Sequence, residues 1–227
     1  MSQTPTDPRT AFDIALEATR KWRAESNLAA ENRSLTGVIT AALRIAVTNH
    51  DEPTSGIAAL NDLDCREHLE RILECNSRIW DALRSNGRPS VAVSHNITAA
   101  HVATLVGEHD LARDLIQPAL DATVINQFPL TPFWRGYATA LDGFFTQSTF
   151  TFPNIKLKGY EKHWMPYISL MVAITSESDP TDAIAAIDDS FDTRNKDKRL
   201  TDWEMIDGDG NVPVRWDFRK ATLLGTS

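Results

Sequence analysis

The sequence predicts an all-α protein, an irregular array of about eight helices packed as hairpins, with a small C-terminal β-hairpin or irregular cap. Apolar residues recur three and four positions apart through most of the chain, which is the spacing of one helix face. Asp7-Pro8, Thr131-Pro132 and Asp179-Pro180 each place a capping residue before a proline, as at helix starts. The helical spacing stops after Lys198, so the last part of the chain is expected to differ.

Gly, Pro and Ser residues mark the turns between the expected helices. The helices are expected, in chain order, at about residues 7–30, 34–49, 64–86, 89–106, 110–118, 131–145, 159–175 and 179–198. Pro118 is expected to kink or end the fifth helix, and Pro166 to set off the first turn of the seventh. The stretch Gln147–Lys158 is expected to be an extended loop.

The C-terminal cap is expected at about residues 199–227, on a helical body of about residues 7–198, and the whole chain is expected to be one domain. Apolar residues flank the run Asp207–Gly210, which is typical of a β-hairpin turn. Beyond it, charged and aromatic residues alternate like the two faces of a strand. The alternating residues are Arg215, Trp216, Asp217, Phe218 and Arg219.

Composition excludes some classes of protein. The formal net charge of −8 argues against non-specific binding to nucleic acid or to an anionic membrane, and it permits a basic partner. The longest apolar runs, such as Ile168–Ile174, are far shorter than the roughly 20 residues of a membrane span, and no signal peptide is expected. Cys65 and Cys75 would lie roughly 15 Å apart on one helix, too far to pair, so a reducing cytoplasmic location is expected.

No motif in the sequence names a reaction. The histidines lack metal-ligand spacing, and there is no phosphate-binding loop and no nucleophile elbow. A calcium loop starting at Asp207 would need Gly and Glu where Val212 and Phe218 stand. We therefore expect no metal, no cofactor and no catalytic residue.

The third expected helix carries opposite charges four residues apart, which is typical of a solvated face with weak ion pairs. The expected pairs are Arg66 with Glu70, Glu67 with Arg71, and Glu74 with Arg78.

Two groups of residues are candidates for contact with a partner. Asp188, Asp189 and Asp192 form an acidic cluster on the eighth expected helix. Tyr160 and Trp164 lie four residues apart on one helix face; they form either a binding surface or an aromatic stripe that faces the core. A further set of charged and aromatic residues is expected to dock the tail onto the helical body. These are Arg194, Asp197, Arg199, Trp216, Asp217 and Arg219.

Three runs in the last third of the chain resemble small all-α immunity proteins of bacterial polymorphic-toxin and type VI-like secretion systems. They are Lys-Gly-Tyr-Glu-Lys-x-Trp at 158–164, Phe-x-x-Arg-Asn-x-Asp-x-Arg at 191–199 and Trp-Asp-Phe-Arg at 216–219. The resemblance implies a protein that binds one cognate toxin and blocks it without catalysis. Because the chain is acidic, a toxin with a basic surface is expected.

Two other classes of function stay open. A helical adaptor would hold a protein or peptide in a groove between helix pairs. An enzyme would build its site from residues scattered along a helical bundle. The oligomeric state stays open as well.

Overall fold

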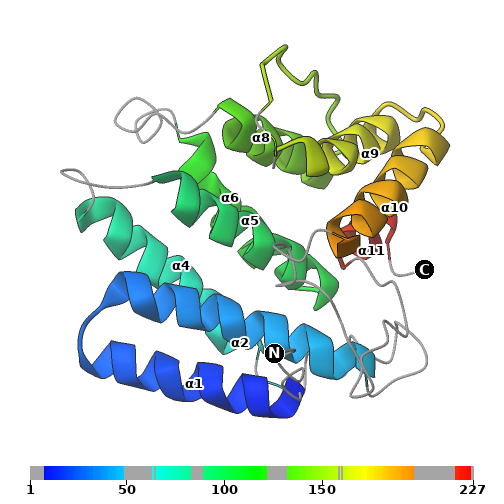
Figure 1. Ribbon diagram of the computed structural model, residues 1–227. Coiled ribbons are helices and arrows are strands. Elements are labelled where there is room, and N and C mark those ends of the chain that lie inside the picture. The colour runs from blue at the N-terminus through cyan, green and yellow to red at the C-terminus, as the bar shows by residue number, and fades with distance from the viewer. Residues whose placement is uncertain are drawn as a thin grey trace.

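The computed structural model describes residues 8–48, 63, 65–82, 89–121, 132–157, 159, 161–196 and 218–225. Within these ranges the chain forms nine α-helices and one short 3₁₀ helix, and no strand (Figure 1). The predicted all-α fold class is confirmed. The expected β-hairpin around Asp207–Gly210 lies outside the described residues.

The first two helices form an antiparallel hairpin, α1 (Pro8–Ala24) and α2 (Leu28–Thr48) (Figure 1). The turn between them falls earlier than the sequence predicts, because α1 ends at Ala24 and α2 begins at Leu28. Ser26 takes a left-handed backbone conformation with φ 55°. The Asn27 side chain then accepts a hydrogen bond from the backbone N–H of Ala30 at 3.2 Å, which caps α2.

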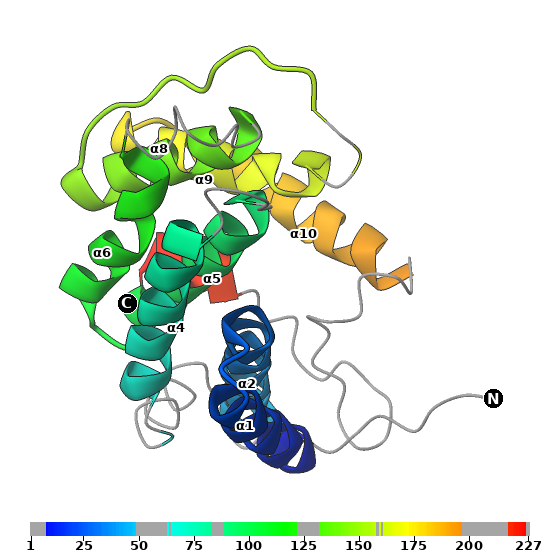
Figure 2. The same ribbon diagram turned by 90° about the vertical axis from the view of Figure 1, so that its left-hand side faces the viewer.

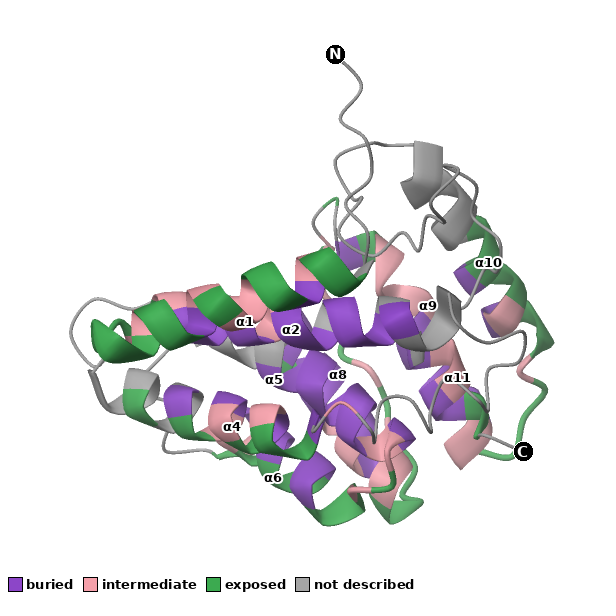
Figure 3. Cartoon of the chain, turned by 90° about the horizontal axis from the view of Figure 1, so that it is seen from below, coloured by how far each residue is buried: buried purple, intermediate pink, exposed green. Residues whose placement is uncertain are grey.

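Helix α5 (Pro89–Leu105) lies at the centre of the molecule and packs against α4 (Cys65–Ala82) and α6 (His109–Leu120) (Figure 2). Every residue from 96 to 103 is buried, so this part of the helix is covered on all sides (Figure 3). Pro118 lies in the last turn of α6, which ends two residues later at Leu120, as expected for a helix-ending proline.

A strap of irregular chain, residues 148–157, crosses the outside of α8 (Pro132–Thr146) (Figure 2). Two glycines of α8 allow this close approach. A Cβ atom on Gly136 would stand 2.5 Å from the Phe152 ring, and one on Gly143 would stand 2.9 Å from the backbone oxygen of Ser148. The predicted extended loop is therefore a packed strap.

The segment before Pro166 is a separate short piece, as predicted: the 3₁₀ helix η1 (Glu161–His163) precedes α9 (Met165–Thr175). Helix α10 (Thr181–Lys196) then packs against α9. The last described element is α11 (Phe218–Leu224), which contacts α5 and α9. The strand-like alternation predicted through Phe218 and Arg219 is therefore wrong at these two residues, because both belong to a helix.

The described helices share one hydrophobic core. Its largest fully buried side chains include Phe133, Tyr137 and Tyr167. Among the described residues, no helix is long and apolar enough to cross a membrane. Cys65 and Cys75 are both buried and form no disulfide with each other, as their spacing predicts.

Candidate functional site

The α9–α10 hairpin concentrates negative charge. From Trp164 to Thr193 the chain has six carboxylates and neither lysine nor arginine, a pattern that can be found from the sequence alone. The carboxylates are Glu177, Asp179, Asp182, Asp188, Asp189 and Asp192. Each of those whose side chain the structure describes is exposed. We call these exposed residues of the α9–α10 turn and α10 the acidic face.

The turn that begins the acidic face is held in one conformation. Glu177 has a left-handed backbone, φ 52°, and its N–H donates to the backbone oxygen of Ile174 at 3.2 Å. The N–H of Ser178 donates to the backbone oxygen of Ala173 at 2.9 Å, which closes the end of α9. Asp179 Oδ1 accepts bonds from Thr181 Oγ1 at 2.6 Å and Thr181 N at 2.9 Å. These bonds lower the pKa of Asp179, so its carboxylate stays charged well into the acid range.

The three predicted aspartates of the partner-binding cluster have different surroundings. Asp188 pairs with Lys220 of α11, with Oδ1 and Nζ 2.7 Å apart. Asp189 is exposed on the same turn of α10. Asp192 lies on α10 as well, and its side chain is outside the described residues. The same is true of the Arg194 side chain.

Trp164 lies in an aromatic cluster, which is the packing alternative of the two that the sequence leaves open. Its ring centroid is 5.7 Å from that of Trp134, 5.8 Å from that of Tyr167 and 6.2 Å from that of Tyr137. Tyr160 lies outside the described residues, as do four residues of the expected docking network. These four are Asp197, Arg199, Trp216 and Asp217.

Arg219 anchors α11 to the core beside the acidic face. Its side chain is buried, and its guanidinium carbon lies 4.1 Å from the centre of the Trp164 ring. The same guanidinium donates a hydrogen bond to Thr98 Oγ1 on α5 at 3.1 Å. Stacking on an indole and donating to a hydroxyl both stabilise a buried guanidinium. The predicted docking role therefore has a physical basis at Arg219. We call Arg219, Trp164, Thr98, His101 and Tyr137 the arginine–aromatic cluster.

His101 and Tyr137 complete the arginine–aromatic cluster. His101 Nε2 and Tyr137 Oη lie 3.1 Å apart, and both residues are fully buried. Burial first, and the positive charge of Arg219 second, hold the pKa of His101 well below its usual range, so the imidazole is neutral. Thr222 of α11 donates to the backbone oxygen of His101 at 3.2 Å, which adds a second tie between α11 and α5.

A second buried polar cluster joins α1, α2 and α4, and we call it the glutamate cluster. The Glu31 carboxylate is 1% exposed and accepts a bidentate pair of bonds from Arg71, at 2.7 and 2.8 Å. Arg23 donates a third bond at 2.8 Å. Burial alone would raise the pKa of Glu31, but the bonds and charges of Arg71 and Arg23 outweigh it and lower the pKa.

The glutamate cluster corrects one predicted ion pair. Arg71 pairs with Glu31, forty residues away, and with Glu74, instead of with the predicted Glu67. The predicted pairing of Arg66 with Glu70 is present at 2.9 Å. Sequence spacing could not reveal the contact with Glu31, because it joins two helices rather than two turns of one helix.

The described residues contain no group of three or more His, Cys, Asp and Glu side chains placed to hold a metal ion. Cys75 lies beside the glutamate cluster, and burial with the nearby Glu31 charge raises the pKa of its thiol to about 11. A thiol with so high a pKa is a poor nucleophile at neutral pH.

Comparison of the chain with protein-family models, with curated proteins and with solved structures gives no match.

Proposed function

We propose that this protein is an immunity-type inhibitor that binds a basic protein toxin through the acidic face of α9–α10. The observation that supports it is a run of thirty residues with six carboxylates and no lysine or arginine, of which the five carboxylates with described side chains are exposed on one helical hairpin. A surface of one charge sign attracts an oppositely charged partner and accelerates its encounter.

The shape of the acidic face also suits a protein partner. The exposed Ala185 and Ala186 lie between the carboxylates, so a partner could approach the α10 backbone closely. The capped turn fixes the backbone of Glu177 and the carboxylate of Asp179 before binding, which lowers the entropy lost on association. Asp188 is already paired with Lys220, so Asp182 is a better candidate for contact than Asp188.

The first experiment is co-purification of this protein with the product of the gene next to its own, followed by calorimetric titration of the two. We expect a tight complex whose affinity falls as salt rises, because exposed charges are screened. No heat of binding, together with undiminished toxicity of that product on co-expression, would overturn the proposal.

A charge-reversal pair tests the location of the surface. Asp182→Lys with Asp189→Lys should weaken toxin binding at least about tenfold, because like charges then face each other across the interface. The matched control is Asp13→Lys with Glu17→Lys, which reverses two exposed carboxylates on α1 instead. Equal affinity of the two double variants would move the contact surface away from α10.

A further inference from the structure

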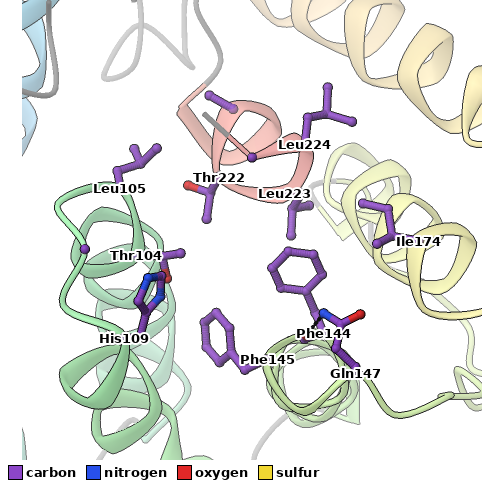
Figure 4. Close-up of a pocket in the computed structure, with 13 residues that line it drawn as sticks. Thr104, Leu105, His109, Phe144, Phe145, Gln147, Ile174, Thr222, Leu223 and Leu224 are labelled. Atoms are coloured by element: carbon purple, nitrogen blue, oxygen red, sulfur yellow. Dashed lines mark hydrogen bonds between the residues drawn. The ribbon is translucent and has the colours of Figure 1, made fainter. Parts of the chain in front are cut away.

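A pocket of about 530 Å³ opens where four helices end (Figure 4). Its walls come from the last residues of α5, α8, α9 and α11, among them Leu105, Phe145, Ile174 and Leu224. The volume is that of a typical small-molecule site. The pocket shares no residue with the acidic face, so a ligand could occupy it whether or not the protein binds a toxin.

The walls of the pocket combine aromatic and aliphatic side chains with polar groups, which contribute nearly half of the exposed lining. The rings of Phe144 and Phe145 have centroids 5.9 Å apart and project into the space between the helices (Figure 4). Leu224 at the rim is 43% exposed. Among the described residues only Ile14 is another large hydrophobic side chain with such exposure. The two rings and the exposed leucine at the rim can bury the apolar part of a ligand.

The electrostatic character of the pocket follows from the helix ends. Each helix C-terminus carries about half a negative charge, and four of them meet here. The chain leaves three of these helices through left-handed residues, Gly107, Gln147 and Gly225, all of which line the pocket. One N-terminus, that of α6 at His109, contributes the opposite sign. No lysine, arginine, aspartate or glutamate is among the described lining residues, so the helix ends supply the fixed dipoles at the pocket, four negative ends against one positive end.

The polar side chains of the pocket point to the same kind of ligand. Thr104 Oγ1 donates to the backbone oxygen of Ala100 at 2.9 Å, and Thr222 Oγ1 to that of His101 at 3.2 Å. Gln147 Nε2 donates to the backbone oxygen of Phe144 at 2.9 Å. The Thr104 hydroxyl has used its one donor hydrogen and can still accept, and so can Oε1 of Gln147. Such a lining favours a ligand that donates hydrogen bonds.

From these observations we propose that the pocket binds a small organic cation, an alkyl- or arylammonium compound with its apolar body between Phe144, Phe145 and Leu223. The ammonium group would meet aromatic ring faces, hydrogen-bond acceptors and the negative ends of four helices, and each of these favours a cation.

Three probes of nearly equal shape test the proposal: 2-phenylethylamine, 2-phenylethanol and phenylacetate. Each is titrated into the full chain at neutral pH and followed by calorimetry and by ligand-observed NMR. We expect the amine to bind about fivefold or more tightly than the alcohol, and the carboxylate to bind most weakly. Carboxylate binding as tight as that of the amine would overturn the assignment of charge. Absence of saturable binding by all three would overturn the site.

Variants at the rim locate the bound amine. Leu224→Lys should weaken amine binding about tenfold, since it brings a cation to the mouth of the pocket, and should change alcohol binding less. Leu224→Gln, of similar size and neutral, serves as the matched control, and Ile14→Lys places the same charge on α1. Circular dichroism checks that each variant is folded. Equal effects of Leu224→Lys and Ile14→Lys on the amine would place its binding elsewhere.

Discussion

The two buried polar clusters stabilise different parts of the molecule by different means. The glutamate cluster neutralises a carboxylate with two guanidinium groups, and its members lie within the first 71 residues. The arginine–aromatic cluster places Arg219 against an indole ring and a hydroxyl, and joins positions 121 residues apart in the sequence. The first ties neighbouring helices together, whereas the second holds the last described helix against the central one. Damage to the second should therefore release α11, and damage to the first should loosen the α1–α2–α4 packing.

The largest effect is expected for Arg219→Ala. The change removes the guanidinium between α5 and α11 and leaves an unfilled space beside Trp164, so we expect the free energy of unfolding to fall by about 3 kcal/mol. Urea denaturation measures it, and limited proteolysis should show earlier cleavage near α11. The neighbouring Lys220→Ala is the control, because it removes a partly exposed ion pair and should cost less than about 1 kcal/mol. Equal losses would show that α11 is not anchored by Arg219.

For Glu31→Gln we expect the free energy of unfolding to fall by about 2 kcal/mol, because Arg71 and Arg23 then face a neutral amide. We expect less than the full cost of a broken buried pair because Arg23 is half exposed and can turn to solvent. The matched variant Glu70→Gln breaks the exposed pair with Arg66 and should cost less than about 0.5 kcal/mol. Denaturant titration measures both. If the glutamate cluster contributes nothing to stability, Glu31→Gln and Glu70→Gln will unfold at the same denaturant concentration.

Tyr137→Phe should cost about 1 kcal/mol, since it deletes the hydroxyl that bonds to His101 and keeps the aromatic packing. Thermal unfolding of the variant and of the native protein measures the loss. Equal midpoints of the two proteins would show that the hydrogen bond to His101 contributes nothing to stability.

The last expected effect is a loss of stability through protonation of His101, which is absent at neutral pH and develops as the pH falls. His101 has a lowered pKa in the folded protein, so the unfolded chain binds the extra proton. The stability associated with His101 is therefore complete above its unfolded pKa, about 6.5, and is lost as the pH falls below that value. Glu31 also has a lowered folded pKa, and its contribution is lost only below about 4.3.

The arginine–aromatic cluster should therefore weaken at a higher pH than the glutamate cluster. The measurement is the free energy of unfolding between pH 7 and 4 for the native protein and for His101→Gln. We expect the variant to lose the pH dependence between 6.5 and 5. The same slope in both proteins would assign the titration to another group.

Much of the helical body could be predicted, because local chemistry determines it. Pro132 opens its helix where the Thr-Pro signal places it, and Pro118 lies in the last turn of α6. The turn after α1 could not be placed, since no glycine or proline marks it and Ser26 adopts a left-handed backbone that serine rarely takes. The sequence pattern predicts a strand through Phe218 and Arg219, but packing on α5 and α9 makes them helical.

Among the candidate sites, too, some features can be predicted from the sequence and others cannot. The acidic face is partly visible in the sequence through Asp188 and Asp189, because charges exposed on one helix stand close together in the chain. The contact between Arg71 and Glu31 and the pocket formed by four helix ends are not visible there. Each depends on which helices meet in space, and residue spacing carries no information about that.

The stacking at Trp164 gives the molecule an optical property. The indoles of Trp134 and Trp164 lie 5.7 Å apart at an angle of 60°, which is close enough for their electronic transitions to couple. Coupled transitions of two rings held at a fixed angle give a paired positive and negative band in circular dichroism. Because Arg219 covers one of these rings, release of α11 would change that band pair while most of the helices remain formed. Circular dichroism of the native tryptophans can thus report whether α11 is packed on the core, without an added label.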